Sequence, residues 1–520
     1  MTDPVLTPAQ RLNNITKNEL AVALASSLGL KFTSAQGTSL VKVHDEARCL
    51  QFFDHDDTFK EADRLLNLLA VLVVNTDGLD GVKSMKDLTA KIDKVTKDID
   101  ETVDGHLSHV YRNSAIRDLE ANWRGVAELV GQVETDEVII DLLDVSKEEL
   151  YKDLEDHAGD IFSSALFEKV YVDEYDRYGG KPFGAMIGLY EFANTPDDLD
   201  WLGTMGDIAN AAHCPFISSA SPQFFDKKFK DFSALETIGD IEAHFRHPRF
   251  GKWEELRDKD SAAYLSLTLP RYLLRRPWDA ERSTERGNRI VKYTERATEP
   301  SKDYLWGNSA ILFARNMVRS FEQSEWCQYI RGPKGGGLVT GLTVHSIISH
   351  EKEETQSPVE LDIADYREYQ FSRSGFNALV HRKDTASATF FSAQSIKKPK
   401  DFVKEIDTQN AYLVTNLAYT LSVTRIAHYV KAMMREYIGS SADGPYIQNT
   451  LQLWLNDYIT TTVNPDDLTL RYYPFKAVTV SVVKKPGPLG WYKATIKILP
   501  HIQFEGMDVE LQLEASLGGK

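Results

Sequence analysis

The sequence predicts a mixed α/β fold (α+β in its overall arrangement), and three observations lead to this prediction. Strand-like and helix-like segments alternate between residues 138 and 219, as in a parallel α/β sheet. A stretch that begins at Asp407 or Thr408 meets no glycine or proline before Gly439, which predicts one long helix. Near the C-terminus, apolar and polar residues alternate on both sides of the turn at residues 486–488, which is typical of a β-hairpin.

Composition limits the partners that the chain can have. The 520 residues include 60 Lys and Arg against 77 Asp and Glu, so the formal net charge is −17. A negative protein is not drawn to nucleic acid or to an anionic membrane, and we expect neither as a partner. The three cysteines are far apart and odd in number, which argues against a disulfide framework and favours the cytoplasm. No apolar run approaches the roughly 20 residues of a membrane span.

The N-terminal leader, residues 1–56, is predicted to contain a short amphipathic helix. Thr16 and Glu19 form a capping-box pattern at its start, and Gly29 supplies a stop. Its narrow apolar seam consists of Leu20, Leu24 and Leu28. Two interpretations stay open, because such a helix either packs on its own domain or is recognised by a partner.

Residues 57–135 are predicted to form a helical region. Helices are expected at residues 57–74, at residues 84–103 and from about Ser114 to Leu129. The second helix has apolar residues three and four positions apart among lysines and aspartates, so it is solvated except on one face. These single apolar faces exceed what a compact α/β core would cover, which predicts contact with a partner protein.

Residues 136–400 are predicted to form the central α/β domain. Ser146 with Glu149 opens one helix as a capping box, and Thr195 before Pro196 opens another. Strands are expected at residues 138–145, 183–190 and 215–219. Because strands and helices alternate here, the sheet should be parallel.

The rest of the central region is more irregular. Residues 253–330 are aromatic-rich and predicted to be helical, with breaks at Pro270 and Pro277. A glycine-rich loop follows at residues 332–337, and short strands are expected from there to about Phe391.

Residues 401–520 are predicted to form a C-terminal domain with the long helix, a shorter helix at residues 451–458 and the hairpin. Pro500 should end the second hairpin strand, because proline cannot donate to a ladder. The hairpin residues that we single out are Val478, Val480, Val482, Thr495, Ile496 and Ile498. A third alternating strand beyond Gly506 carries Val509, Leu511 and Leu513. Such a terminal strand pairs locally or adds to the sheet of another molecule.

No motif in the chain indicates enzyme chemistry. The loop at residues 332–337 lacks the Gly-Lys-Ser/Thr ending of a phosphate loop and follows a predicted helix instead of preceding one. Two histidine pairs have a spacing that can bind a metal, but no cysteine or carboxylate cluster accompanies them. These pairs are His106 with His109 and His244 with His247. We therefore expect no metal site and no cofactor.

A rival interpretation is an α/β enzyme of the cytosol whose site is assembled from dispersed residues. The candidates for such a site are Asp141, Asp144, Glu191 and His213. Cys214 has only the adjacent His213 as a base, and adjacent residues rarely face each other. The basic run from Arg271 to Arg296 is interrupted by four acidic residues, which favours a protein contact or solvated surface over a nucleic-acid groove.

Eight segments between residue 117 and residue 501 carry a family resemblance, in the order that the family has them. They are Arg117-Asp-Leu-Glu-Ala-Asn-Trp-Arg-Gly125, Ile187-Gly-Leu-Tyr-Glu-Phe192, Ala211-Ala-His-Cys-Pro-Phe216, Trp253-Glu-Glu-Leu-Arg257, Leu269-Pro-Arg-Tyr-Leu-Leu-Arg275, Trp306-Gly-Asn308, Arg425-Ile-Ala-His-Tyr-Val-Lys431 and Leu499-Pro-His501. With them the chain resembles the large sheath subunit of the bacterial type VI secretion system, the TssC, VipB or EvpB type, which is related to contractile phage-tail sheath proteins.

This resemblance implies a structural protein and no enzyme. The implied partners are a small sheath subunit of the TssB or VipA type, which residues 57–135 would bind, copies of the chain itself in a helical tube, an inner tube of the Hcp type and a baseplate. The resemblance also implies that neighbouring subunits exchange strands, which would give residues 509–513 a partner. In many members the AAA+ unfoldase ClpV grips an N-terminal helix, which would be the helix with Leu20, Leu24 and Leu28.

Overall fold

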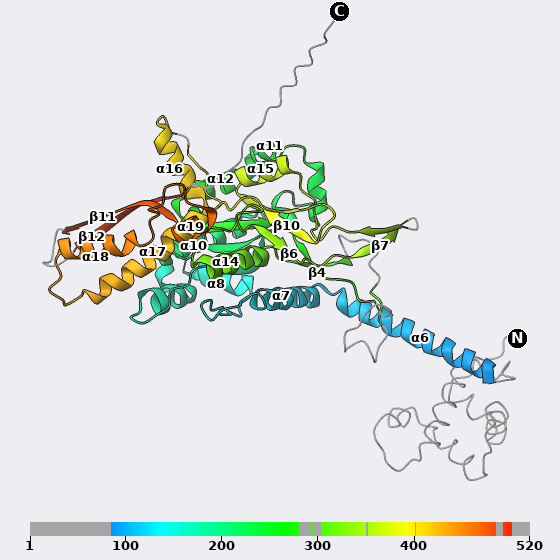
Figure 1. The fold of residues 1–520 in the computed structure, drawn as a ribbon. Coiled ribbons are helices and arrows are strands. Elements are labelled where there is room, and N and C mark those ends of the chain that lie inside the picture. The colour runs from blue at the N-terminus through cyan, green and yellow to red at the C-terminus, as the bar shows by residue number, and fades with distance from the viewer. Residues whose placement is uncertain are drawn as a thin grey trace, which may run out of the picture. The chain divides into compact units, whose positions relative to one another are not determined.

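The structure is a computed structural model that describes residues 85–157, 159–279, 293–295, 303–349, 352–400, 402–484 and 492–501 (Figure 1). The chain divides into two units, which are described separately. One consists of Met1–Asn113 with Trp278–Glu295, and the other of Ser114–Pro277 with Arg296–Lys520. The predicted leader helix, the predicted helix at residues 57–74 and the predicted strand at residues 509–513 lie outside the described residues.

The described part of the first unit is dominated by α6 (Met85–Tyr111). The helix predicted at residues 84–103 is confirmed, and it continues to Tyr111. Near its end, Tyr111 stacks on Tyr293 with ring centroids 5.5 Å apart. Ile99 on this helix is exposed.

The second unit is built around a six-stranded sheet, and the predicted parallel α/β arrangement is confirmed. The strand order is β1-β2-β3-β9-β10-β6. The strands are β1 (Met186–Phe192), β2 (Phe216–Ala220), β3 (Leu265–Leu269), β9 (Phe376–His381), β10 (Ser387–Phe390) and β6 (Leu338–Thr340). The first four are parallel to one another, whereas β10 runs antiparallel to both β9 and β6.

Helices pack on both faces of this sheet. On one face, an aromatic-rich core joins the sheet to α10 (Pro196–Ala212), α12 (Gly251–Asp258) and α15 (Asp365–Arg373). On the other face, α14 (Ala310–Ser324) packs against apolar residues of β2, β9 and β10. The result is a three-layer α/β/α arrangement.

Smaller elements complete the second unit. The other helices are α7 (Ser114–Val130), α8 (Lys147–Asp156), α9 (Ala165–Phe167), α11 (Ile241–Phe245), α16 (Glu405–Thr415), α17 (Leu417–Glu436), α18 (Gly444–Asn456), α19 (Asp467–Tyr472) and the π-helix η3 (Glu168–Asp176). The 3₁₀ turns are η2 (Ile161–Ser163), η4 (Pro222–Phe224), η5 (Phe232–Thr237), η6 (Pro248–Phe250) and η7 (Asp260–Tyr264). Three two-stranded sheets pair β4 (Tyr272–Arg275) with β5 (Leu305–Gly307), β7 (Ser346–Ser349) with β8 (Lys352–Thr355), and β11 (Phe475–Lys484) with β12 (Tyr492–Pro500).

The two helix starts predicted at Ser146 and Thr195 are confirmed, and both are formed by local capping bonds. At the start of α8, the Glu149 N–H donates to Ser146 Oγ at 3.1 Å, and the Ser146 N–H donates to Glu149 Oε2 at 2.9 Å. Thr195 caps α10 by accepting from the Asp198 N–H at 3.2 Å. These bonds satisfy backbone donors that have no partner inside the helix.

Several predicted elements differ from the structure. The shorter helix expected at residues 451–458 is α18, which begins earlier, at Gly444, because Asp443 caps it, and it ends at Asn456. Residues 138–145 form no strand, because Val138 and Ile140 pack on the cluster around α14 while the backbone joins no ladder among the described residues. The strand predicted at residues 183–190 begins three residues later than expected, since β1 begins at Met186. Residues 253–330 are not continuously helical, because Leu265–Leu269 is β3, a fully buried strand near the centre of the sheet.

The long helix predicted up to Gly439 is two helices, which meet at Asn416. Asn416 has an extended backbone, and its side chain accepts from the Ala418 N–H at 3.0 Å, so it caps α17. The next amide, Leu417 N–H, donates to Ala393 O at 2.8 Å instead of to α16. The interpretation as one buried central helix is therefore wrong; α17 is buried mainly in its first half.

Candidate functional site

The hairpin confirms the predicted pairing and shows which of its residues share a face. Val478 pairs with Ile498 and Val480 with Ile496, and Val478 and Val480 are buried. This face packs on an apolar cluster that includes three residues of α18, namely Ile447, Leu451 and Leu455. Val482 belongs to the same cluster.

The opposite face of the hairpin is exposed and mostly polar, with Val483 and Leu499 as its exposed large apolar side chains. Thr495 lies on this face, opposite Ser481. The other five hairpin residues that we singled out are apolar and lie on the covered face. Lys493 and Lys497 are exposed on the same face. The two-stranded sheet therefore has one apolar face that α18 covers and one cationic face that no described element covers.

The base of the hairpin is fixed to the second unit. The His501 N–H donates to Pro474 O at 3.1 Å, and Gln328 Nε2 donates to His501 O at 3.3 Å. Phe475 is fully buried and meets Trp326 edge to face at 5.3 Å between ring centroids. The hairpin is thus held by its base, and its strands extend from there.

A second candidate surface lies on α7. One side of this helix packs on α14, where Leu129 is buried in a cluster with Ile311. The other side exposes Ile116, Leu119 and Trp123, the last two by 59% and 62%. Residues three and four positions apart share a helix face, so these side chains form a continuous apolar stripe.

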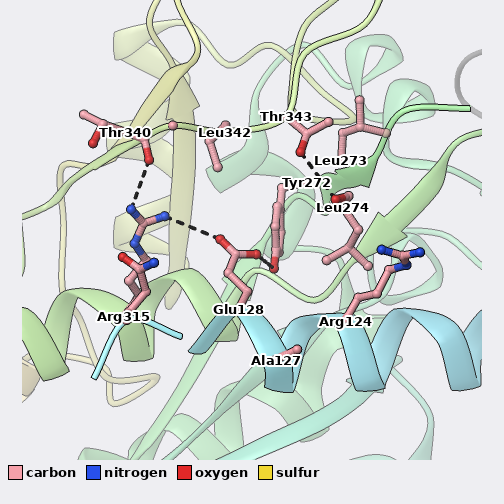
Figure 2. A pocket seen from close by; sticks show the side chains of 12 residues that line it. Arg124, Ala127, Glu128, Tyr272, Leu273, Leu274, Arg315, Thr340, Leu342 and Thr343 are labelled. Atoms are coloured by element: carbon pink, nitrogen blue, oxygen red, sulfur yellow. Dashed lines mark hydrogen bonds and ion pairs between the residues drawn. The ribbon is translucent and has the colours of Figure 1, made fainter. Parts of the chain in front are cut away.

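Ion pairs and a hydrogen bond fix α7 to the sheet next to this stripe. Glu120 bonds to Arg275 and to Arg124, each at 2.7 Å. About two turns further on, Tyr272 Oη donates to Glu128 at 2.7 Å, and Arg315 lies 3.4 Å from the same carboxylate (Figure 2). Burial and the charge of Glu128 both raise the pKa of Tyr272.

These side chains line a pocket of about 500 Å³ between α7, α14, β4 and the end of β6 (Figure 2). Arg315 also donates to Thr340 O at 3.1 Å, and Arg124 is engaged by Glu120. The charged groups at the pocket are therefore bound to one another, which makes them supports of the α7 attachment.

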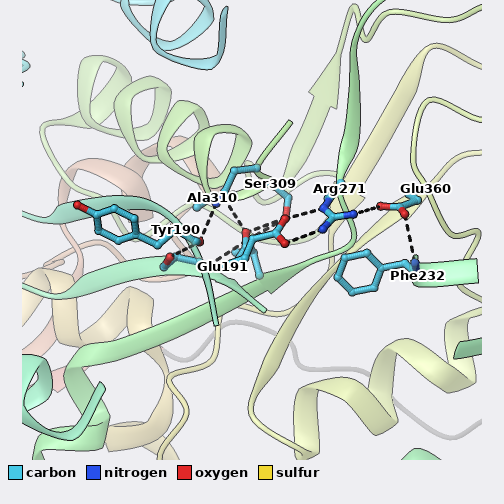
Figure 3. A network of polar contacts seen from close by, with 11 residues as sticks. Tyr190, Glu191, Phe232, Arg271, Ser309, Ala310 and Glu360 are labelled. Atoms are coloured by element: carbon cyan, nitrogen blue, oxygen red, sulfur yellow. Dashed lines mark hydrogen bonds and ion pairs between the residues drawn. The ribbon is translucent and has the colours of Figure 1, made fainter. Parts of the chain in front are cut away.

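A partly buried ion-pair network lies at the carboxyl ends of β1 and β3 (Figure 3). Arg271 holds both oxygens of Glu191 at 2.6 Å and lies 3.4 Å from Glu360. Glu360 also accepts from the Phe232 N–H at 3.2 Å. Burial raises the pKa of Glu360 to about 7, and the charge of Arg271 opposes this rise without cancelling it.

A layer of buried hydroxyl groups continues from this network between the sheet and α14. Ser219 bonds to Thr268 at 2.8 Å, and Ser309 donates to Thr268 at 2.9 Å. Asn308 ties the layer to β1 by donating to Tyr190 O at 3.0 Å. These hydrogen bonds join β1, β2 and β3 to the start of α14.

The structure gives different surroundings to the four residues of the rival enzyme interpretation. Asp141 and Asp144 are exposed in the irregular segment before α8, and Glu191 is engaged by Arg271. His213 lies 3.1 Å from Tyr264 Oη, and burial together with Lys431 lowers its pKa. Among the parts of the chain that the structure describes, no hydrogen bond or ion pair joins any two of these four residues. The enzyme interpretation therefore gains no support.

Other candidate sites are equally occupied by structural contacts. Cys214 is buried, which raises the pKa of its thiol above the ordinary value. His244 Nε2 lies 2.9 Å from Phe225 O and 2.9 Å from Arg249. Within the described residues, no group of three His, Cys, Asp or Glu side chains could hold a metal ion. Over the same residues, no helix has the length and apolar character to span a membrane.

The sequence alone did not reveal the Arg271 network. The sequence did contain a signal for it. Leucines alternate with serine and threonine from Leu265 to Leu269, as in a strand, and Arg271 lies two residues beyond the end of that strand. Polar residues at the carboxyl ends of parallel strands meet at one edge of the sheet.

The hairpin exposes one face, and α7 exposes an apolar stripe, whereas the charged groups of the interior are engaged in structural contacts. Residues 93–397 match the tail sheath N-terminal domain of the EvpB/VC_A0108 family, and residues 406–517 match its gpW/gp25-like tail sheath domain. The chain belongs to this tail sheath family. The resemblance found from the sequence motifs is confirmed, and the chain is a structural subunit of a type VI secretion sheath.

One curated relative is similar over most of the chain. It is the type VI secretion system sheath protein TssC1 of Pseudomonas aeruginosa, which is 34% identical over 443 residues, or 84% of this chain and 86% of the relative. Among solved structures, the anti-feeding prophage baseplate has a chain with 8% identity and a TM-score of 0.33, over 61% of this chain and 66%, just under two thirds, of that chain. The contracted helical sheath of the same prophage gives 10% identity and a TM-score of 0.29, with 61% and 67% covered.

Proposed function

We propose that this protein is the large subunit of a contractile sheath in the bacterial cytoplasm. It assembles with a small sheath subunit of the TssB or VipA type and with copies of itself into a helical tube around an inner tube of the Hcp type. The tube stands on a baseplate, and its contraction propels the inner tube. Its work is mechanical and not enzymatic, because subunits rotate between two packed arrangements. The sheath name of the relative supports this proposal.

The observation that carries the proposal is the form of the C-terminal hairpin. β11 and β12 pair only with each other in a continuous ladder among the described residues, so this sheet is two strands wide. An isolated two-stranded sheet is marginal in water and tends to gain strands. The alternating pattern of Val509, Leu511 and Leu513 would supply such a strand from a neighbouring subunit.

Truncation after Gly506 tests this assembly mode. We expect the truncated chain to fold with the small subunit but to form no tubes by electron microscopy. Leu511→Pro should have the same effect, because proline removes a ladder donor. Glu510→Lys, on the alternate face, is the milder control. Tubes from the truncated chain would show that the linkage between subunits lies elsewhere.

We propose that the stripe on α7, within the helical region of residues 57–135, contacts the small subunit. An apolar side chain as exposed as Trp123 is normally covered by a partner when it belongs to a continuous stripe. Trp123→Asp together with Leu119→Asp should abolish co-purification of the small subunit. Tyr369→Asp, at a side chain that is 60% exposed on α15, is the matched control and should leave it unchanged.

Expression of the chain without a small subunit is a further test. We expect aggregation or a heterogeneous sample, because the stripe on α7 stays uncovered. A stable, monodisperse monomer that binds little hydrophobic dye would contradict the proposed role of this surface.

We propose that the predicted leader helix with Leu20, Leu24 and Leu28 is a handle for the unfoldase ClpV. Support comes only from the capping pattern and the narrow apolar seam in the sequence. Such a seam fits a groove on a partner better than it anchors a domain. The handle would be hidden in one sheath state and exposed in the other.

A further inference from the structure

The segment before α8 exposes acidic and apolar side chains together. We call residues 136–144 the acidic segment, in which residues 138–144 form neither helix nor strand. Its carboxylates are exposed, and among the described residues no hydrogen bond or ion pair engages them. The acidic residues are Asp136, Glu137, Asp141 and Asp144. The exposed apolar residues are Ile139, Leu142 and Leu143, with exposed fractions of 65%, 61% and 53%.

The backbone of the acidic segment is fixed at both ends. Before it, the Glu134 N–H donates to Glu322 Oε1 of α14 at 2.8 Å. After it, Tyr190 Oη donates to Val145 O at 2.7 Å. In the middle, Ile140 packs in the apolar cluster at α14. The exposed side chains are therefore presented on an ordered backbone, which lowers the entropic cost of binding a partner.

Two arginines lie where the glycine-rich loop meets α14 and α19. Arg319 Nη2 donates to Gly336 O, and Arg471 Nη2 donates to Lys334 O at 3.2 Å. The other acceptors of the two guanidinium groups are side-chain amide oxygens of α14. All of these acceptors are neutral. Among the described residues, no carboxylate forms an ion pair with either guanidinium group.

The positive charges at this place repel one another. Burial, together with the charges of Arg315 and Arg471, lowers the pKa of Arg319 below its ordinary value. Arg315 is paired with Glu128, but Arg319 and Arg471 have no such counter-charge. Asp467 lies four residues before Arg471 on α19 and forms no ion pair with it in the described structure. A carboxylate from another molecule would relieve this repulsion.

Apolar side chains lie beside these cations on α19. Leu468 is 59% exposed and Tyr472 is 48% exposed. They are four residues apart, and Arg471 is three residues from Leu468, so the three side chains share one face of the helix. The ring of Tyr329 lies 4.8 Å from the Arg471 guanidinium carbon. We call the following residues the cationic surface: Arg319, Lys334, Leu468, Arg471 and Tyr472.

We propose that the acidic segment of one copy of this chain binds the cationic surface of a second copy. The inference rests on the helical tube proposed above and names a contact that joins its subunits. Because the two surfaces differ, the contact is head-to-tail. Contacts of this kind repeat into a helix when they do not close into a ring.

Charge favours a second copy as the occupant. Copies with a net charge of −17 repel one another as whole molecules, so their association is helped by a local cationic surface that meets an acidic one. Both surfaces also carry exposed apolar side chains, which would be covered together. Within one chain, no hydrogen bond or ion pair among the described residues joins the two surfaces.

Spacing is compatible with simultaneous contact at two charges. Lys334 and Gly336, whose carbonyl groups accept from the two arginines, are two residues apart and so at most about 7 Å from each other. Asp141 and Asp144 are three residues apart, which allows a separation of up to about 11 Å. Two carboxylates of one segment can therefore reach two guanidinium groups held by one loop.

Charge reversal tests the contact from each side. Lys334→Glu with Arg471→Glu makes the cationic surface acidic, and Asp141→Arg with Asp144→Arg makes the acidic segment basic. Each full-length variant is co-expressed with the small subunit, and the lowest protein concentration that gives tubes by electron microscopy is measured. We expect each variant alone to need at least about tenfold more protein than the wild type, because like charges then meet.

Mixing the two variants is the decisive measurement. The reversed surface of the first variant fits the reversed segment of the second, and the unchanged segment of the first fits the unchanged surface of the second. The mixture should therefore form tubes with alternating chains near the wild-type concentration, although neither variant does so alone. A chain with all four substitutions should also assemble by itself. A misfolded variant would not be rescued in this way.

Matched controls reverse the same number of charges at other exposed positions. Arg382→Glu with Lys383→Glu corresponds to the first variant, and Glu155→Arg with Asp156→Arg corresponds to the second. Both controls should form tubes within about twofold of the wild-type concentration, and mixing them should bring no gain. This outcome would separate the local contact from the effect of net charge.

Pair formation below the tube-forming concentration tests the contact independently of the tube. By native mass spectrometry, the mixture of the two reversed variants should give pairs with one copy of each, at least about tenfold more than either variant alone. A mixture that pairs no better than its components would overturn the proposal, as would wild-type tube formation by either variant alone. Absence of tubes from the wild type would refute the proposed sheath function, whereas pairs in the mixture would still support this contact.

Discussion

Glu360→Gln tests whether burial or the ion pair with Arg271 decides the charge of this carboxyl group. The side chain of Glu360 is fully buried, and it accepts from the Phe232 N–H. Glutamine has nearly the same shape and keeps that acceptor. It is neutral at every pH, so it resembles the protonated acid. Arg271 keeps both of its bonds to Glu191 in the variant.

The expected magnitude follows from the shift of one pKa. Burial raises the pKa of Glu360 from 4.5 to about 7, and each pKa unit corresponds to about 1.4 kcal/mol. A carboxyl group with a raised pKa in the folded state binds its proton more tightly there than in the unfolded chain. Its contribution to stability is therefore present at low pH and is lost as the pH rises from 4.5 to 7. The loss amounts to about 3 kcal/mol.

The assay is urea unfolding of the wild type and the variant, each co-purified with the small subunit, at pH 5 and pH 8, followed by tryptophan fluorescence. The free energy of unfolding of Glu360→Gln, relative to the wild type, should increase by about 3 kcal/mol between these two pH values. The control is Glu236→Gln at an exposed position, which should show no such change. A difference between Glu360→Gln and the wild type that is equal at pH 5 and pH 8 would refute the raised pKa.

Three further predictions concern local structure and recognition. Gly188→Ala should destabilise the protein by about 1 to 3 kcal/mol, because the added Cβ would lie 2.4 Å from Phe216 Cζ, whereas Gly184→Ala has open space and should be neutral by thermal unfolding. Ser146→Ala should cost about 1 kcal/mol by removing the capping box of α8, and faster amide exchange in the first turn of that helix would report it. Leu24→Asp should leave tube assembly intact but abolish binding of the unfoldase in a pull-down assay; failure of assembly would place this helix in the structural core instead.

Local signals explain the elements that were predicted correctly. Ser146 and Thr195 start helices through bonds to residues three positions away, so the sequence contains the whole interaction. The hairpin is similar, because alternation fixes its two faces and Pro500 ends its second strand. Thr495 belongs to the polar face because successive side chains of a strand point to opposite faces.

Elements decided by distant contacts were predicted less well. Asn416 interrupts an otherwise helical stretch because the Leu417 amide bonds to Ala393, which lies in a different segment. Residues 138–145 have the composition of a strand, but among the described residues they have no neighbouring strand with which to pair. In the sequence, Gln448 and Gln452 of α18 look like ordinary helix residues. Only the position of β11 beside them shows that their side-chain amides bond to the backbone of that strand.

The two parts of α17 pack in different apolar clusters, and this has a mechanical consequence. Leu417 and Leu421 near its start belong to the core of the six-stranded sheet, whereas Ile426 and Val430 further along belong to the cluster under the hairpin. An α-helix of 20 residues is about 30 Å long and stiff on this scale. If a neighbouring subunit holds the hairpin, as proposed above, a force on the hairpin acts through α17 on the core of the sheet. The interruption at Asn416 leaves α16 outside this connection.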